Sequence, residues 1–78
     1  MGTKVPRGLT GQRLRRALVR LGFEIAHVAG SHHYLRHPVT GRAVVVSVHG
    51  GKRVVPVGTL TAILRQAGVS IDELVASL

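Results

Sequence analysis

The chain has 78 residues, which is enough for one compact domain but too few to divide between two hydrophobic cores. Its 11 lysines and arginines outnumber three acidic residues and give a formal net charge of +8, so polyanions such as nucleic acid are the partners that its charge favours. It contains no cysteine, which excludes disulfide bonds, thiolate metal sites and a cysteine nucleophile.

Residues 1–8 are rich in glycine, proline and positive charge, and they predict a basic flexible lead-in to a single domain over residues 9–78. This beginning lacks the apolar stretch of a signal peptide, and the longest apolar runs are too short to span a bilayer. We therefore expect a cytoplasmic protein that has no membrane partner.

A first helix is expected to begin after Thr10 and to end before Gly22. Its apolar residues recur at the spacing of an amphipathic helix, and they are Leu14, Ala17, Leu18 and Leu21. Thr10 can serve as the N-cap, and Gly22 can take the left-handed conformation that ends a helix. The arginines of this segment fall largely outside the apolar stripe.

Residues 23–29, 31–37 and 42–49 then show the twofold periodicity of β-strands. Gly30-Ser31 separates the first two strands, and residues 38–41 supply a hairpin turn before the third. In the first strand, strict alternation places four residues on one side: Phe23, Ile25, His27 and Ala29.

Residues 50–53 predict a flexible basic loop, and residues 54–56 should be extended because the residue before a proline disfavours the helical conformation. A second amphipathic helix is then expected to end at Gly68, with an apolar stripe made of Leu60, Ile63, Leu64 and Ala67. Ser70 and Glu73 have the spacing of a capping box, which predicts a short last helix.

The order α-β-β-β-α with a terminal helical turn predicts an α+β fold, in which a three-stranded antiparallel sheet carries its helices packed on one face. The other face of the sheet is then free. Double-stranded-RNA-binding domains share this order of elements, and they recognise RNA through its shape, its phosphates and its 2′-hydroxyls.

Histidine is unusually frequent in this chain, at His27, His32, His33, His37 and His49. In the second strand Leu35 should face the core, and alternation turns His33 and His37 the same way. The residues between them then lie on the open face: His32, Tyr34 and Arg36. An exposed imidazole can exchange protons near neutral pH, which suits it to general acid or base catalysis. From spacing alone, the interpretation that His32 is an exposed histidine with no catalytic function is equally good.

Lys52 and Arg53 are interpreted as phosphate contacts, because the preceding glycines lack the spacing of a Walker loop. Tyr34 is the candidate stacking platform for a base. The expected RNA contacts are therefore Ser31, Tyr34, Arg36, Lys52 and Arg53. Three acidic residues are too few for two-metal hydrolysis, and the adjacent His32 and His33 diverge from a strand, so neither a metal site nor a cofactor is expected.

Several short motifs occur together along residues 9–74. They are Leu21-Gly22-Phe23, Gly30-Ser31-His32-His33, His49-Gly50, Gly58-Thr59-Leu60 and Ile63-Leu64-Arg65-Gln66-Ala67-Gly68. As an ordered set they resemble the HicA toxins of bacterial toxin-antitoxin pairs. The resemblance implies a double-stranded-RNA-binding-like fold, ribosome-independent cleavage of messenger RNA, and a HicB-type antitoxin that covers the active surface.

The resemblance also implies a catalytic histidine in the Gly-Ser-His element, which falls on His32 in this chain. His33 is the alternative, since members of the family differ in how histidines follow the Gly-Ser pair, and strand alternation favours His32. Two other interpretations need no catalytic histidine. One is a non-catalytic RNA-binding module, and the other is a subunit whose basic face binds an acidic protein.

Overall fold

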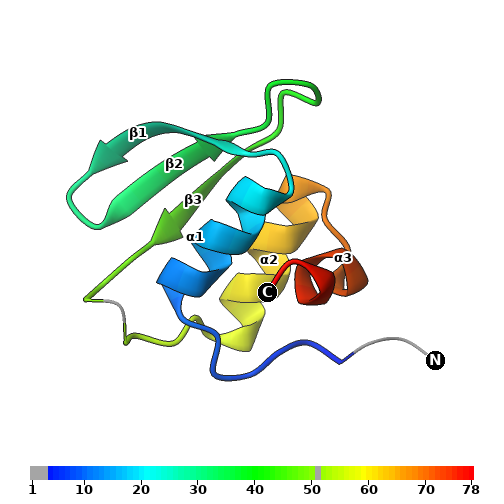
Figure 1. Ribbon diagram of the computed structural model, residues 1–78. Helices are drawn as coiled ribbons and strands as arrows, with labels where there is room; N and C mark the ends of the chain where they lie inside the picture. Colours follow the sequence, from blue (N-terminus) through cyan, green and yellow to red (C-terminus); the bar gives the residue numbers. More distant parts are fainter. Residues whose placement is uncertain (1–3, 51) are drawn as a thin grey trace.

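The computed structural model describes residues 4–50 and 52–78, and within these ranges it contains three helices and three strands (Figure 1). In chain order they are α1 (Gly11–Arg20), β1 (Glu24–Ala29), β2 (His32–Arg36), β3 (Ala43–Ser47), α2 (Val57–Ala67) and α3 (Ile71–Ala76). The predicted α+β class and order of elements are confirmed. Residues 1–3 of the expected lead-in and Gly51 of the expected loop lie outside the described residues. None of the described helices is long and apolar enough to cross a membrane.

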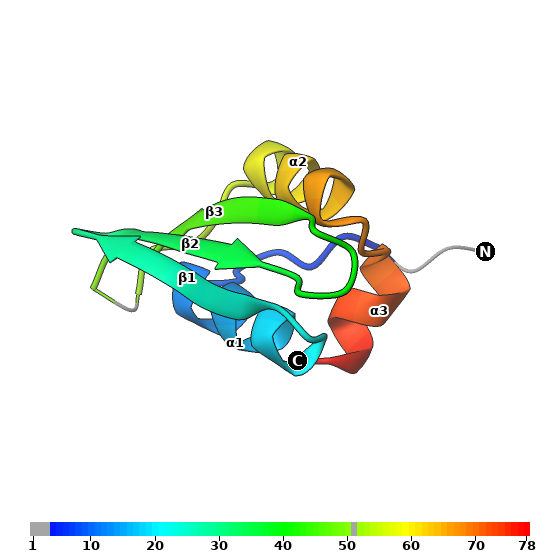
Figure 2. The same cartoon turned by 90° about the horizontal axis from the view of Figure 1, so that it is seen from above.

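The strands form an antiparallel sheet in the order β1-β2-β3, and the helices lie beneath one of its faces in Figure 1. Figure 2 shows the same arrangement from above. Leu35 of β2 pairs with Val44 of β3, and both side chains are buried in the core. Since successive side chains of a strand alternate between faces, the residues on either side of Leu35 lie on the opposite, open face.

β1 departs from strict alternation because a β-bulge interrupts its pairing with β2 between Ile25 and His27. Ile25 lies opposite Leu35 on the core side. His27 lies opposite Tyr34, so the extra residue Ala26 moves His27 and the residues after it to the other face. The predicted grouping of Ile25 and His27 on one side of the strand is therefore wrong. The open face gains a second imidazole as a result.

The hydrophobic core lies between the sheet and the helices and draws on all of these elements except β1. Its largest fully buried side chains are Leu9, Leu14, Leu18, Leu35, Val46, Leu60 and Leu74. Burial of a leucine side chain contributes about 1.5–3 kcal/mol, whereas a whole domain retains only about 5–15 kcal/mol of stability. The position of the sheet therefore depends on a few apolar contacts, which include the predicted stripe of α2 and that of α1 except for Leu21, which is only half-buried.

α1 begins and ends where the sequence predicts. The hydroxyl of Thr10 accepts a hydrogen bond from the backbone N–H of Arg13 at 3.2 Å, and Gly22 follows the helix with a φ of 100°. The first turn of α1 lies directly against the end of β3, because a Cβ at Gly11 would overlap the carbonyl oxygen of Ser47. The lack of a side chain at Gly11 thus allows the close approach of α1 to the sheet.

The segment that leads from β3 to α2 is held against the start of the domain. Val54 forms an isolated antiparallel bridge with Thr10. The backbone N–H of Val55 donates a hydrogen bond to the carbonyl oxygen of Leu9 at 2.7 Å. The extended conformation predicted before Pro56 is therefore stabilised by a distant part of the chain. These contacts fix the backbone on the C-terminal side of the basic loop.

α2 ends and α3 begins where the sequence predicts. α2 ends at Gly68, which has a φ of 70°, and α3 begins with the predicted capping box. The hydroxyl of Ser70 accepts a hydrogen bond from the backbone N–H of Glu73 at 3.0 Å, and the Glu73 carboxylate accepts one from the backbone N–H of Ser70 at 2.9 Å. The pKa of the Glu73 carboxyl group is lowered below its ordinary value. The main cause is its hydrogen bond with the Ser70 backbone, and the second is a hydrogen bond with the Ser70 side chain.

Ser70→Ala is expected to lower the free energy of unfolding by about 1 kcal/mol, because a backbone N–H of α3 loses its acceptor. The pKa of Glu73 is lower in the folded state, so the stabilisation from its carboxylate is present above the unfolded pKa and is lost as the pH falls through the folded one. Urea unfolding at neutral pH and at about pH 3 tests both points. Ser70→Ala keeps the backbone N–H that bonds to the Glu73 carboxylate, so Glu73→Gln is measured beside it. Wild type and Glu73→Gln should differ less in acid than at neutral pH, and an equal difference at both pH values would contradict the role of the Glu73 carboxylate.

Candidate active site

His32 is the first residue of β2 and follows a tight turn from β1. Ala29 pairs with His32 across this turn, and Gly30 occupies the first central position with a φ of 58°. A left-handed residue at that position is what a type II′ hairpin requires, and it favours glycine. The side chain of His32 is exposed on the open face. The turn thus fixes the backbone of the candidate catalytic residue and leaves its imidazole accessible.

The surroundings of His32 include the end of β3. Ser47 is its direct cross-strand partner. The backbone N–H of Val48 donates a hydrogen bond to the carbonyl oxygen of Ser31 at 2.7 Å, so the pairing of the two chain segments continues past the end of β3. Ser31, a predicted RNA contact, is half-buried directly beside this pairing. The backbone on both sides of the histidine is therefore well anchored.

The other predicted contacts on β2 lie at increasing distance from His32. Tyr34 is 39% exposed, and its ring centroid lies 5.6 Å from that of His27. Arg36 is exposed at the far end of the strand, where it pairs with Glu24 of β1. Arg36 lies four positions along the strand from His32, a distance of about 13 Å at about 3.3 Å per residue. Arg36 therefore lies at the opposite end of β2 from His32.

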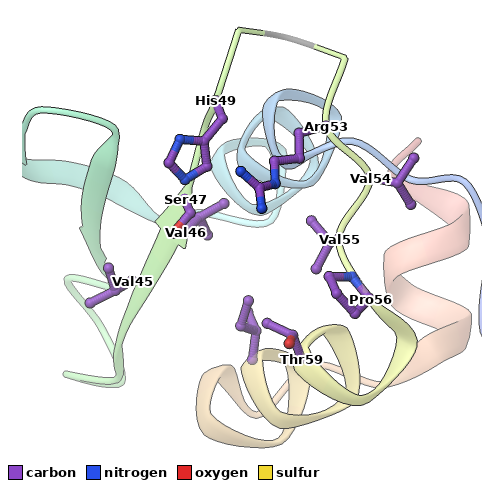
Figure 3. Close-up of a pocket in the computed structure, with 10 residues that line it drawn as sticks. Val45, Val46, Ser47, His49, Arg53, Val54, Val55, Pro56 and Thr59 are labelled. Atoms are coloured by element: carbon purple, nitrogen blue, oxygen red, sulfur yellow. The ribbon is translucent and has the colours of Figure 1, made fainter.

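A groove of about 270 Å³ lies between β3, the segment that follows it and the start of α2 (Figure 3). Ser47 and His49 line it from one side, and Arg53 lines it from the other. In Figure 3 the imidazole of His49 and the guanidinium of Arg53 extend toward the same space. The remaining lining residues are Val45, Val46, Val54, Val55, Pro56, Thr59 and Ile63.

The groove and the open face of the sheet meet at β3. Ser47 is the partner of His32 and also lines the groove, and Val45 is the partner of Tyr34 and lines it too. Directly opposed side chains have Cβ atoms only about 4.5–5.5 Å apart. A nucleic acid strand that crossed β2 and β3 would therefore contact His32 and then reach Arg53.

Positive charge lies at the groove, where Arg53 is among the lining residues. Lys52 is exposed beside Arg53, although it is not among the residues that line the groove. The chain has three acidic residues; two lie in α3, and the third, Glu24, pairs with Arg36 at the far end of the sheet. Clefts lined by one sign of charge concentrate ligands of the opposite sign. The vicinity of His32 and the groove is therefore suited to phosphate groups.

His33 occupies the opposite face from His32, as alternation predicts. It pairs with Val46 of β3 and Val28 of β1, and its side chain is half-buried. Its Nδ1 atom is buried and has no hydrogen-bond partner among the described residues. The two adjacent histidines thus differ in access to a ligand on the open face, which His32 can contact directly.

His37 stabilises the turn between β2 and β3. Its Nδ1 accepts hydrogen bonds from the backbone N–H groups of Val39 at 3.2 Å and Thr40 at 3.3 Å. Its ring packs edge-on against Phe23, with 5.1 Å between the ring centroids. These contacts join the turn to the core and give His37 a structural role.

Potential metal ligands do not gather at the candidate site. Within residues 4–50 and 52–78, no group of three or more histidines, cysteines or acidic residues is arranged to hold a metal ion. His32 and His33 point to opposite faces of β2, so one ion could not bind both side chains. The chemistry available at the open face is that of imidazole, hydroxyl and guanidinium groups.

His49 is the groove residue to which the sequence assigned no function. Alternation along the predicted third strand could have placed His49 on the same side as Val45 and Ser47. The position of Arg53 opposite His49 had no comparable signal, because it depends on the bridge between Val54 and the start of the domain. The groove is therefore a product of tertiary structure.

A second basic surface lies on α1, in the helical layer of the molecule. Arg13, Arg16 and Arg20 share one face of the helix and line a depression of about 160 Å³ with Leu78. The guanidinium of Arg20 donates a hydrogen bond to the carbonyl oxygen of Ser77 at 2.8 Å. This surface is separate from the open face that carries the predicted site residues.

Comparison with known proteins identifies the family. No curated protein matches the chain in sequence. The model of a family described as the HicA toxin of bacterial toxin-antitoxin systems matches residues 11–69. This range begins at the first residue of α1, extends just beyond α2, and includes the whole sheet, the groove and every predicted site residue. The match spans most of the chain, and the protein belongs to the HicA toxin family, whose members are ribonuclease-type toxins paired with an antitoxin.

Proposed function

We propose that this toxin is an endoribonuclease that cleaves messenger RNA without the ribosome and without a metal ion, with His32 as its general base or acid. The observation that carries the proposal is the position of His32. Its imidazole is exposed on the open face, beside Ser47 and next to a groove lined by Arg53. Family membership supports a ribonuclease-type reaction.

The reaction that suits these groups uses RNA as its own nucleophile. His32 removes the proton from a 2′-hydroxyl, and the 2′-oxygen attacks the adjacent phosphorus. Negative charge then develops on the phosphate oxygens, and the guanidinium of Arg53 stabilises it. This step needs no activated water, which is the reason for proposing that the enzyme works without a metal ion.

RNA binding in this proposal combines phosphate contacts with stacking. Tyr34 stacks on a base next to the cleaved bond, and Arg36 binds the backbone at a neighbouring nucleotide. Lys52 contributes a phosphate contact from the loop, and Ser31 contributes one beside the turn that precedes His32. Much of the affinity should come from phosphate contacts, so we expect binding to weaken as salt increases.

We propose further that the antitoxin is of the HicB type and acts in the cytoplasm, where it covers the open face. The sheet offers such a partner both apolar surface and charge. Tyr34 and Val45 are 39% and 41% exposed side by side, close to the cations of the groove. A partner that is acidic at its contact surface would cover His32 and exclude RNA.

Purified wild-type protein incubated with a labelled transcript in chelator provides the test. We expect strand breaks in chelator, and we expect them to disappear when a HicB-type antitoxin is added. A mobility shift without strand breaks would contradict the proposal and support a non-catalytic RNA-binding module. Cleavage that appears only after a divalent cation is restored would contradict the metal-independent reaction.

A further inference from the structure

His49 lies close to His32 on the same surface. The antiparallel pairing of His32 with Ser47 and the hydrogen bond from Val48 to Ser31 continue into the segment after β3. His49, two residues beyond Ser47, is thus the diagonal neighbour of His32. Residues in this diagonal relation are about 7–8 Å apart and within reach of each other's long or aromatic side chains.

The groove directs His49 toward this shared space. Its side chain lines the groove together with Ser47, so both groups lie on the side of the segment that faces the site. Figure 3 shows the imidazole of His49 and the guanidinium of Arg53 extending into the same space from opposite walls. A phosphate between the two histidines would therefore have His32 on one side, His49 on the other, and Arg53 nearby.

Cleavage of RNA by its own 2′-hydroxyl needs two proton transfers. The 2′-hydroxyl loses a proton as the bond from O2′ to phosphorus forms. The bond from phosphorus to the 5′-oxygen then breaks, and that oxygen must gain a proton to leave as a hydroxyl. The products are a 2′,3′-cyclic phosphate and a 5′-hydroxyl. A second positioned acid should contribute about 10²–10⁴-fold to such a reaction.

We propose that His49 is this second group, the general acid that gives a proton to the departing 5′-oxygen while His32 acts as the base. The inference rests on the proposed ribonuclease function and adds a second catalytic residue to it. Proton balance is complete, since one proton passes to His32, another comes from His49, and solvent exchange restores both imidazoles. Arg53 binds the phosphate oxygens between the two histidines.

The test uses a substrate that needs no acid. A short RNA with one cleavage site, mapped with wild-type protein, is made in two forms, with oxygen or with sulfur as the 5′-bridging atom at that site. A thiol has a pKa of about 8.5, far below that of an alcohol hydroxyl, so a thiolate can leave without being protonated. Single-turnover rates on both substrates are measured for wild type, His49→Ala, His49→Gln and Arg53→Ala.

His49→Ala and His49→Gln should cleave the oxygen substrate about 10²–10⁴-fold more slowly than wild type. Both variants should cleave the sulfur substrate within about tenfold of the wild-type rate. Arg53→Ala should be slow on both substrates, because charge develops on the phosphate oxygens in either case. Arg65→Ala, which removes an exposed cation in the last turn of α2 away from the groove, should match wild type on both.

Two results would overturn the assignment of His49. One is cleavage of the oxygen substrate by the His49 variants at the wild-type rate, and the other is equal loss on both substrates in variants with wild-type circular dichroism. Either result would leave the proposed ribonuclease function intact. Wild-type protein that cleaves neither substrate would instead overturn the proposed function and the role of His49 together.

Discussion

His32→Ala is expected to slow RNA cleavage by about 10²–10⁴-fold, the usual contribution of a positioned proton-transfer group. The imidazole is exposed on the open face, so its removal opens no cavity in the core. The variant should therefore fold and bind RNA nearly as well as wild type. Single-turnover cleavage and binding, measured on the same labelled transcript, separate the chemical step from affinity. Expression of the variant should no longer arrest growth.

His33→Ala is the matched control, because it removes the same side chain one residue away on the opposite face. Its half-buried ring packs between Val28 and Val46, so we expect some loss of stability with cleavage by the folded protein largely retained. The reverse pattern, with cleavage lost in His33→Ala and kept in His32→Ala, would move the catalytic role to His33. Full activity in both variants would show that neither histidine is catalytic.

Gly11→Ala is expected to destabilise the protein by about 1–3 kcal/mol. A Cβ at this position would overlap the carbonyl oxygen of Ser47, so either the first turn of α1 or the end of β3 must move. For a domain of this size, each kcal/mol corresponds to about 4–8 °C in Tm. Ser47 is also the partner of His32, so cleavage by the folded variant should fall as well. Thermal unfolding and single-turnover cleavage measure the two effects.

Gly58→Ala provides the control for this prediction. Gly58 lies in the first turn of α2, and a Cβ there would have no atom within 4 Å. The same substitution should therefore stabilise the protein by about 0.4–1 kcal/mol, because alanine restricts the unfolded chain more than glycine does. Opposite signs at the two positions are the expected result. Stabilisation by Gly11→Ala would contradict the close contact between α1 and β3.

The helices could be predicted from sequence because their determinants are local. Thr10 caps α1, Gly68 ends α2, and Ser70 with Glu73 opens α3, as the spacing of these residues indicates. The orientation of β2 was also predictable, since Leu35 defines the buried face and leaves His32 exposed. In each case neighbouring residues are sufficient to determine the structure.

The bulge in β1 could not be predicted in this way. Nothing in the local pattern marks Ala26 as an extra residue, and its insertion reverses the side on which His27 lies. The groove could not be predicted from the local pattern either. Arg53 faces His49 because Val54 and Val55 pair with residues at the start of the domain, which are far away in sequence. Long-range pairing therefore determines which cations and imidazoles meet, while the sequence indicates only that they are present.

The most direct test of the catalytic site removes one oxygen atom from the substrate. A short RNA with a single mapped cleavage site is compared with the same RNA in which the nucleotide before the cut carries hydrogen in place of its 2′-hydroxyl. In chelator, the wild-type toxin should cut the first RNA to leave a 2′,3′-cyclic phosphate and a 5′-hydroxyl, and it should leave the second intact. Cleavage of both RNAs at the same position and rate would contradict the account, because the 2′-oxygen would then not be the nucleophile.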